Sequence, residues 1–171
     1  FGNITVGEHV GVEELADRYD AVIYAIGAQS GRFLGIPGED LPGSVAAVDF
    51  VGWYNAHPHF YECAPNLSCR RAVVVGNGNV ALDVARILVT DPAELRSTDI
   101  ADHALELLQP RNVEEVVIVG RRGPLQATFT SPELRELGHL KGLADVDVVI
   151  DPAEFAGITD EDIEAAPKNP K

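Results

Sequence analysis

The sequence lacks the features that would place this chain in a membrane, on nucleic acid or around a metal. No apolar run is long enough to span a bilayer. Lys and Arg number only 13 against 27 Asp and Glu, and the formal net charge of −14 argues against general binding to nucleic acid or anionic lipid. The two cysteines, Cys63 and Cys69, form no recognisable redox pair and are too few for a metal cage. We expect no metal site and a reducing compartment.

Methionine is absent as well, and the chain opens on Phe1 without a signal or transit peptide. We therefore expect further sequence before Phe1. At the other end, the segment from Glu154 to Lys171 is acidic and contains proline, with no strand to close a fold. A length of 171 residues with 46% hydrophobic content is enough for one domain plus part of another.

A buried strand, a glycine turn and an apolar helix follow one another between residues 72 and 88. In the G-x-G-x-x-A pattern, Gly76 permits a tight turn, Gly78 lets the backbone approach a pyrophosphate, and Ala81 keeps the helix close to its strand. The helix N-terminus would offer unpaired N–H groups to the phosphates. The pattern alone is weak, but in this strand–turn–helix context it predicts a Rossmann-like dinucleotide-binding domain of the α/β class with a parallel sheet.

A second buried run, Val116–Gly120, ends in the adjacent pair Arg121 and Arg122. In this fold the second strand ends beside the adenosine ribose, where an acid selects NAD and an arginine accommodates the 2′-phosphate of NADP. No acid occupies that position, so we predict NADP, held by charge-assisted guanidinium contacts. The alternative is a solvated arginine pair in a turn.

In this fold the residue that contacts the ribose usually follows the glycine loop by about 20 residues. The arginine pair lies much further than that from Gly76. We attribute the excess to residues 91–112, interpreted as a surface excursion with a short helix of its own. Ser97, Thr98 and Asp99 are candidate N-cap residues, and Pro110 would end the helix.

The flanking segments indicate parts of two domains. Glu13–Arg18 predicts a short polar helix, and Ala21–Gly27 predicts a buried strand that ends another nucleotide-binding domain. Gly35–Gly43 is rich in glycine and proline, which is typical of a crossing between domains. Val146–Ile150 predicts a third strand of the second domain.

Several segments together resemble the NADPH–ferredoxin reductases of the adrenodoxin reductase type, and among these the bacterial members. The likeness covers nearly the whole chain and is carried by long identical runs. These runs are Tyr24–Ala28, Asp49–Asn55, Gly76–Leu88, Gly120–Gln126, Phe129–Thr130 and Glu133–Leu137.

The resemblance implies roles for individual residues. Asn77, Gly78, Asn79 and Val80 match the pyrophosphate loop of the family, and Arg121 and Arg122 match its 2′-phosphate pair. Glu133 and Arg32 match residues that bind NADP, and Val6 matches a position whose backbone touches the FAD adenine. The cofactor-binding residues that we predict are therefore Gly76, Asn77, Gly78, Asn79, Val80, Arg121, Arg122, Glu133 and Arg32 for NADP, and Val6 for FAD.

The resemblance also implies a domain arrangement and an activity. Residues 1–43 would belong to a discontinuous FAD-binding domain and its crossover, and residues 44–171 to an NADP-binding domain that is incomplete at its C-terminus. The intact protein would be a flavoprotein that moves electrons between NADPH and ferredoxin, or a similar iron–sulfur protein, through FAD. A cytoplasmic location is expected, with the mitochondrial matrix as the alternative.

Two other functions stay open from the sequence. The flavin subunit of a glutamate synthase-like oxidoreductase shares the glycine–proline crossing, a glycine loop and arginines after the second strand. A stand-alone NADP-binding module would use the same loop without flavin or catalysis. The segment 91–112 and the run 121–126 favour the ferredoxin reductase over the first of these.

Overall fold

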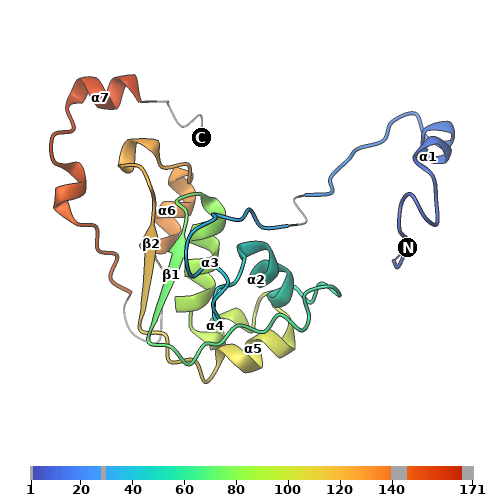
Figure 1. Cartoon of the computed structure of the whole chain (residues 1–171), viewed down its shortest axis with the longest axis horizontal. Coiled ribbons are helices and arrows are strands. Elements are labelled where there is room, and N and C mark those ends of the chain that lie inside the picture. The colour runs from blue at the N-terminus through green and yellow to red at the C-terminus, as the bar shows by residue number, and fades with distance from the viewer. Residues whose placement is uncertain (1, 28–29, 140–145, 167–171) are drawn as a thin grey trace.

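The computed structural model describes residues 2–27, 30–139 and 146–166, and Figure 1 shows their arrangement. The strands are β1 (Arg71–Val75) and β2 (Glu115–Val119). The α-helices are α1 (Val12–Arg18), α2 (Ala47–Tyr54), α3 (Asn79–Val89), α4 (Pro92–Leu95), α5 (Asp102–Leu108), α6 (Ser131–Leu137) and α7 (Asp160–Ala165). Short 3₁₀ turns cover Pro124–Gln126 and Pro152–Phe155.

The two predicted central strands are confirmed. β1 and β2 pair in parallel, with Arg71 opposite Glu115 and Val75 opposite Val119. Parallel neighbours need a crossover connection, and α3, confirmed after the glycine turn, begins that connection. The unit is therefore the strand–helix–strand arrangement on which a dinucleotide fold is built.

Ion pairs join the two strands at their first residues and at the residues just before them. Arg70 lies 2.5 Å from Glu114, and Arg71 lies 2.5 Å from Glu115. Hydrogen bonding to Arg70 lowers the pKa of the Glu114 carboxyl, although both side chains are exposed. Both arginines are therefore already paired with a glutamate at or just before the start of β2.

The hydrophobic core lies between α2, α3 and the helices that follow α3. Its largest fully buried side chains are Trp53 and Leu108. Its buried members are Phe50, Trp53, Leu67, Val84, Leu88, Leu95, Ala104, Leu105 and Leu108. Trp53, whose run carried part of the family resemblance, is 1% exposed and packs 5.6 Å from Phe50, ring centre to ring centre.

The prediction that residues 91–112 form a surface excursion is wrong. The segment folds into two helices, and Ala104 and Leu108 of α5 are both 0% exposed. Both residues are buried in one cluster with residues of α2 and α3, so the segment is part of the hydrophobic core. The spacing of Ala104, Leu105 and Leu108 places one apolar stripe along α5, and such a stripe must be buried against another element.

The predicted N-cap of this helix is also wrong. α5 has Ala101 as its N-cap, without a side-chain cap, and the Ala101 N–H donates to the Tyr54 carbonyl at 2.9 Å. Ser97 and Thr98 act on the preceding helix instead. Their hydroxyls donate to the carbonyls of Glu94 (2.8 Å) and Leu95 (2.7 Å) at the end of α4.

A buried guanidinium joins the ends of two core helices. Arg111 is 7% exposed and donates to the carbonyl of Thr90 after α3 (2.6 Å) and to that of Leu108 at the end of α5 (3.2 Å). Burial lowers the pKa of Arg111, while the charge of Asp91 acts in the opposite direction. A cation is favourable at helix C-termini, so Arg111 stabilises both ends at once.

The outer segments differ from the sequence predictions. The polar helix at residues 13–18 is confirmed as α1, which buries none of its residues. Ala21–Gly27, predicted as a buried strand, has no regular secondary structure, and Ile23 is 89% exposed. Val146–Ile150, predicted as a third strand, is also unpaired, with Val149 86% exposed. Both runs have strand-like composition, but no described strand lies beside either to complete a hydrogen-bonded ladder.

The glycine–proline crossing is ordered by one carboxylate. Glu39 accepts hydrogen bonds from the backbone N–H groups of Leu34 (2.6 Å) and Gly35 (2.7 Å). The Leu34 bond is the main reason that the pKa of Glu39 lies below its usual value. Gly35, Gly38 and Gly43 all have positive φ, which a turn of this kind needs.

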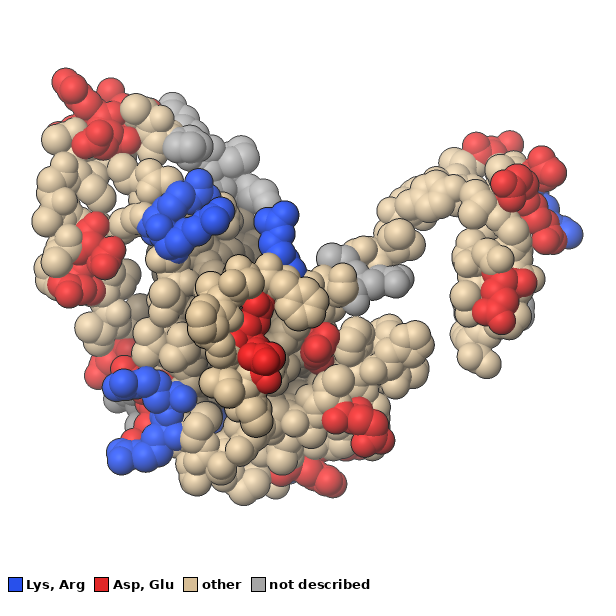
Figure 2. Space-filling view, in the orientation of Figure 1, with Lys and Arg blue, Asp and Glu red and all other residues tan. Residues whose placement is uncertain are grey.

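Figure 2 shows acidic side chains spread over the visible face, with the basic ones gathered in a few separate groups. The net charge is thus not confined to one terminus. Within the described ranges, no helix combines the length and apolarity needed to cross a bilayer.

Candidate dinucleotide site

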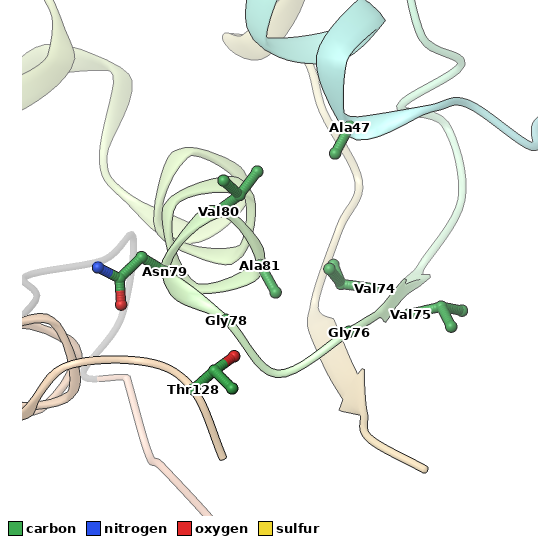
Figure 3. A pocket seen from close by; sticks show the side chains of 9 residues that line it. All are labelled: Ala47, Val74, Val75, Gly76, Gly78, Asn79, Val80, Ala81 and Thr128. Carbon is green, nitrogen blue, oxygen red and sulfur yellow. The ribbon is translucent and has the colours of Figure 1, made fainter. Parts of the chain in front are cut away.

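An open pocket of about 410 Å³ lies where β1 passes into α3. Figure 3 shows it bounded by the end of β1, the glycine turn, the first turn of α3, the start of α2 and Thr128. Its lining residues are Ala47, Val74, Val75, Gly76, Gly78, Asn79, Val80, Ala81 and Thr128. Five of the predicted loop and helix positions therefore surround one cavity, while Ala47 and Thr128 were not predicted.

Gly76 and Gly78 create the shape of the loop. Gly76 has φ 137°, a left-handed conformation that glycine adopts at least cost. A Cβ on Gly76 would lie at an ordinary 4.0 Å from the Ala81 Cβ, so the positive φ rather than a lack of space favours glycine at this position. A Cβ on Gly78 would lie 3.1 Å from the Thr128 hydroxyl, so any side chain there would crowd the pocket.

The start of α3 presents backbone donors to this pocket. Gly78 is the N-cap of α3 and has no side-chain cap, and its carbonyl accepts from the Ala81 N–H at 3.0 Å. Among the described residues, the N–H groups of Gly78, Asn79 and Val80 have no acceptor. Unpaired N–H groups at the positive end of a helix dipole are suited to an anion such as a pyrophosphate.

The glycine loop is tied to the segment that begins α6. The Asn77 carbonyl accepts from the N–H groups of Thr128 (3.0 Å) and Phe129 (3.2 Å). The Asn79 Oδ1 accepts from the Thr130 N–H at 2.8 Å, and Thr130 is the buried N-cap of α6. These bonds bring a segment about fifty residues away in sequence to the rim of the pocket. No local signal in the sequence marks Thr128, because it is placed by bonds to its backbone.

Arg121 and Arg122 follow β2 after the single residue Gly120, at the edge of the sheet where the β1 loop also lies. Both are exposed, and within the described part of the chain neither forms an ion pair. Arg70 and Arg71, the other adjacent pair, are each bound to a glutamate. The two pairs therefore differ: the one at the carboxyl end of the sheet remains available to an anion.

Residues 2–148 match the family model described as pyridine nucleotide-disulphide oxidoreductase. The match includes both strands, the glycine loop and the arginine pair. The chain belongs to the pyridine nucleotide-disulphide oxidoreductase family.

Individual relatives agree with this family assignment. The chain is 73% identical over 168 residues to NADPH-ferredoxin reductase FprA of Mycobacterium tuberculosis, covering 98% of this chain and 36% of that protein. It is 52% identical over 166 residues to the mitochondrial NADPH:adrenodoxin oxidoreductase of Bos taurus, covering 97% of this chain and 33% of that protein. The chain thus spans about a third of the length of these relatives.

A solved structure shows the same fold. The chain superposes on Mycobacterium tuberculosis FprA in complex with NADPH with a TM-score of 0.85 at 73% sequence identity. The alignment covers 96% of this chain and 36% of that one. The α/β, Rossmann-like class predicted from the sequence is confirmed, as is the resemblance to reductases of the adrenodoxin reductase type.

The remaining predicted residues of this family member lie at different distances from the pocket. Glu133 is on the first turn of α6, the helix whose start is bonded to Asn79. Arg32 follows Gly31, where a Cβ would lie 2.7 Å from that of Ala46, the residue before pocket-lining Ala47. Neither residue is among those that line the pocket, so their contact with the nucleotide stays a prediction.

Val6 lies elsewhere. It is 54% exposed and forms an isolated bridge with Val10 in the N-terminal segment, which Figure 1 shows apart from β1 and α3. It is not among the residues that line the pocket. An FAD contact of Val6 therefore stays a prediction.

An ionic cluster that the sequence did not indicate joins α3 to α6. Arg86 lies 2.6 Å from Asp83 on its own helix and also pairs with Glu136 of α6. The Asp83 carboxylate is therefore bound to the Arg86 guanidinium. Together with the Asn79–Thr130 bond, it fixes α6 along α3.

Proposed function

We propose that this chain is the NADP-binding part of a flavoprotein oxidoreductase that moves electrons between NADPH and ferredoxin through FAD. One observation carries the nucleotide assignment. Backbone donors at the start of α3 and an arginine pair after β2, both without partners among the described residues, occupy the same edge of one parallel unit. The names of the relatives, an NADPH-ferredoxin reductase and an NADPH:adrenodoxin oxidoreductase, support the choice of reaction.

The residues of the glycine loop fit the diphosphate of the nucleotide. Gly76 and Gly78 leave a cradle that a Cβ would fill, and the N–H groups of Gly78, Asn79 and Val80 supply the donors. Asn77 shapes the loop through its carbonyl bonds to Thr128 and Phe129. The diphosphate would be held without a positively charged side chain in the loop itself.

The other proposed contacts surround this loop. Arg121 and Arg122 bind the 2′-phosphate, and Glu133 and Arg32 bind the nucleotide from α6 and from the segment before α2. The guanidinium groups make the site selective for NADP, since their contacts to a phosphate are charge-assisted and NAD lacks that phosphate.

When bound, NADPH supplies a hydride to FAD, and FAD supplies single electrons to the acceptor. The work of this chain is to bind and orient the nucleotide. We assign no acid, base or nucleophile among its residues. For FAD we propose only the backbone of Val6, as part of a domain that includes residues 1–43, with residues 44–171 forming the NADP domain.

The proposed electron partner is a ferredoxin or a similar iron–sulfur protein, because two groups of relatives are named for such partners. Arg70 and Arg71 are engaged by Glu114 and Glu115, so we place no partner on them. The proposed location is the cytoplasm, with the mitochondrial matrix as the alternative.

The test is calorimetric titration of the purified chain with NADPH and with NADH, while its visible absorption spectrum is recorded. We expect NADPH to bind at least about tenfold more tightly, a difference of about 1.4 kcal/mol. Gly76→Val should abolish binding of both nucleotides, because a β-branched residue is strained at φ 137° and would distort the turn. Equal binding of NADPH and NADH, or no binding of either, would refute the proposal.

A further inference from the structure

The side chain of Asn77 rests against the one residue that separates β2 from the arginine pair. A Cβ on Gly120 would lie 2.8 Å from the Asn77 Nδ2, 3.1 Å from its Cγ and 3.3 Å from its Cβ. Real Cβ atoms essentially never approach another atom to 2.8 Å, and the Asn77 Cβ at 3.3 Å cannot turn away by side-chain rotation, so a side chain at residue 120 would displace Asn77 or the end of β2.

The contact between Gly120 and Asn77 lies just beyond the last hydrogen bond of the sheet. The last bond between the two strands runs from the Gly76 N–H to the Val119 carbonyl at 2.8 Å. In the described part of the chain, no backbone hydrogen bond fixes Gly120. Packing against Asn77 is therefore the contact that the structure shows for the chain as it leaves β2 and enters Arg121.

Asn77 is itself held from another side. Its carbonyl accepts the N–H groups of Thr128 and Phe129, and the Thr128 hydroxyl lies 3.4 Å from the same oxygen. One residue of the glycine loop thus contacts both the segment before α6 and the end of β2. A shift of Asn77 would move the loop relative to the arginine pair.

We propose that Gly120 and Asn77 form a specificity-determining pair that sets the spacing between the diphosphate loop and Arg121–Arg122. This inference rests on the proposed NADP function. The diphosphate and the 2′-phosphate of NADP are joined by a covalent frame of nearly fixed span, so both can be bound together only if the loop and the arginines keep a matching distance. NAD carries no 2′-phosphate, so its binding does not depend on that distance.

The experiment measures the ratio of NAD⁺ to NADP⁺ dissociation constants by calorimetry in the full chain and in three variants. In Gly120→Ala, the added methyl group displaces Asn77 or the end of β2, and we expect the ratio to fall about tenfold, since small misplacements of binding groups are costly. Asn77→Ala/Gly120→Ala removes the atoms nearest to the new methyl. We expect it to have the same ratio as Asn77→Ala alone, even if both bind more weakly overall.

Gly123→Ala is the matched control. It adds a methyl group on the other side of the arginine pair, where the nearest atom would be the Gln126 Oε1 at an ordinary 3.7 Å and φ is −67°. The ratio should therefore be unchanged. Circular dichroism and melting temperature establish that each variant is folded. If Gly120→Ala alone does not fold, the comparison of Asn77→Ala with the double variant carries the test.

The outcomes distinguish a failure of this inference from a failure of the proposed NADP function. If the unaltered chain does not prefer NADP⁺, the proposed function fails. If it prefers NADP⁺ and Gly120→Ala retains the full ratio, the pair does not determine specificity. A double variant with a lower ratio than Asn77→Ala would also overturn the inference, because the defect would not arise from the contact with Asn77.

Discussion

The side-chain oxygen of Asn79 accepts a hydrogen bond from the backbone N–H of Thr130 at 2.8 Å, joining the first residue of α3 to the N-cap of α6. The sequence placed Asn79 in the nucleotide loop. In the structure its carboxamide oxygen is bound by the protein, while its amide nitrogen has no acceptor among the described residues.

Replacing Asn79 with Ala should release the start of α6 and weaken NADP⁺ binding about tenfold, as expected for loss of a bond worth about 1 kcal/mol and of one amide donor. Amide hydrogen exchange without nucleotide should become faster at Thr130. Asn79→Asp is the control, because it retains the acceptor. Exchange at Thr130 that is unchanged in Asn79→Ala would contradict the role of this bond.

The buried face of α5 predicts a large loss of stability on truncation. Leu108 is 0% exposed, and Leu108→Ala should lower the free energy of unfolding in urea by about 2–5 kcal/mol. Glu106→Ala, an exposed change on the same helix, should have little effect. Similar small losses for both variants would restore the interpretation of residues 91–112 as a surface excursion.

The buried Arg111 should also matter for stability. Arg111→Ala leaves the carbonyls of Thr90 and Leu108 without their donor, and we expect a loss of about 2–3 kcal/mol from charged hydrogen bonds and packing. Arg96→Ala, an exposed arginine at the end of α4, is the matched control. Urea unfolding compares the two, and equal midpoints would show that Arg111 is dispensable.

The crossing at residues 35–43 should respond to acid through Glu39. Its folded-state pKa lies below the usual 4.5 because Leu34 and Gly35 donate to the charged form. A lowered pKa means that the stabilisation is present above about 4.5 and is lost as pH falls through the folded-state value. A carbon-detected NMR titration should give Glu39 a pKa below 4.5, and amide exchange at Gly35 should become faster in Glu39→Gln. A Glu39 pKa at or above 4.5 would contradict the geometry.

The sequence predicted the strand–loop–helix–strand unit because its signals are local. Val73 and Ile118 lie in short apolar runs, and Gly76 and Ala81 have the spacing that a dinucleotide turn requires. Each signal is read within a few residues and needs no knowledge of the remainder of the chain.

The predictions that were wrong concern pairing and packing over longer distances. Ile23 and Val149 lie in runs with strand composition, but composition shows only that a run can join a sheet, and neither has a described neighbour to join. Leu108 is buried in the same cluster as Trp53 of α2. Thr128 lies at the pocket because its backbone N–H is bonded to the Asn77 carbonyl. The apolar spacing along α5 indicates that one face of the helix is buried, but a single sequence does not show which distant residues it contacts.

The central claim is that Arg121 and Arg122 select NADP through its 2′-phosphate, and calorimetry of NADP⁺ and NAD⁺ binding to Arg121→Ala/Arg122→Ala tests it most directly. Arg70→Ala/Arg71→Ala is the control, since it removes an equal charge from arginines that are already paired with glutamates. We expect the Arg121/Arg122 variant to lose at least about tenfold in NADP⁺ affinity, about 1.4 kcal/mol, while NAD⁺ binding and the control variant change little. Equal losses for both nucleotides, or equal losses in both variants, would contradict the claim.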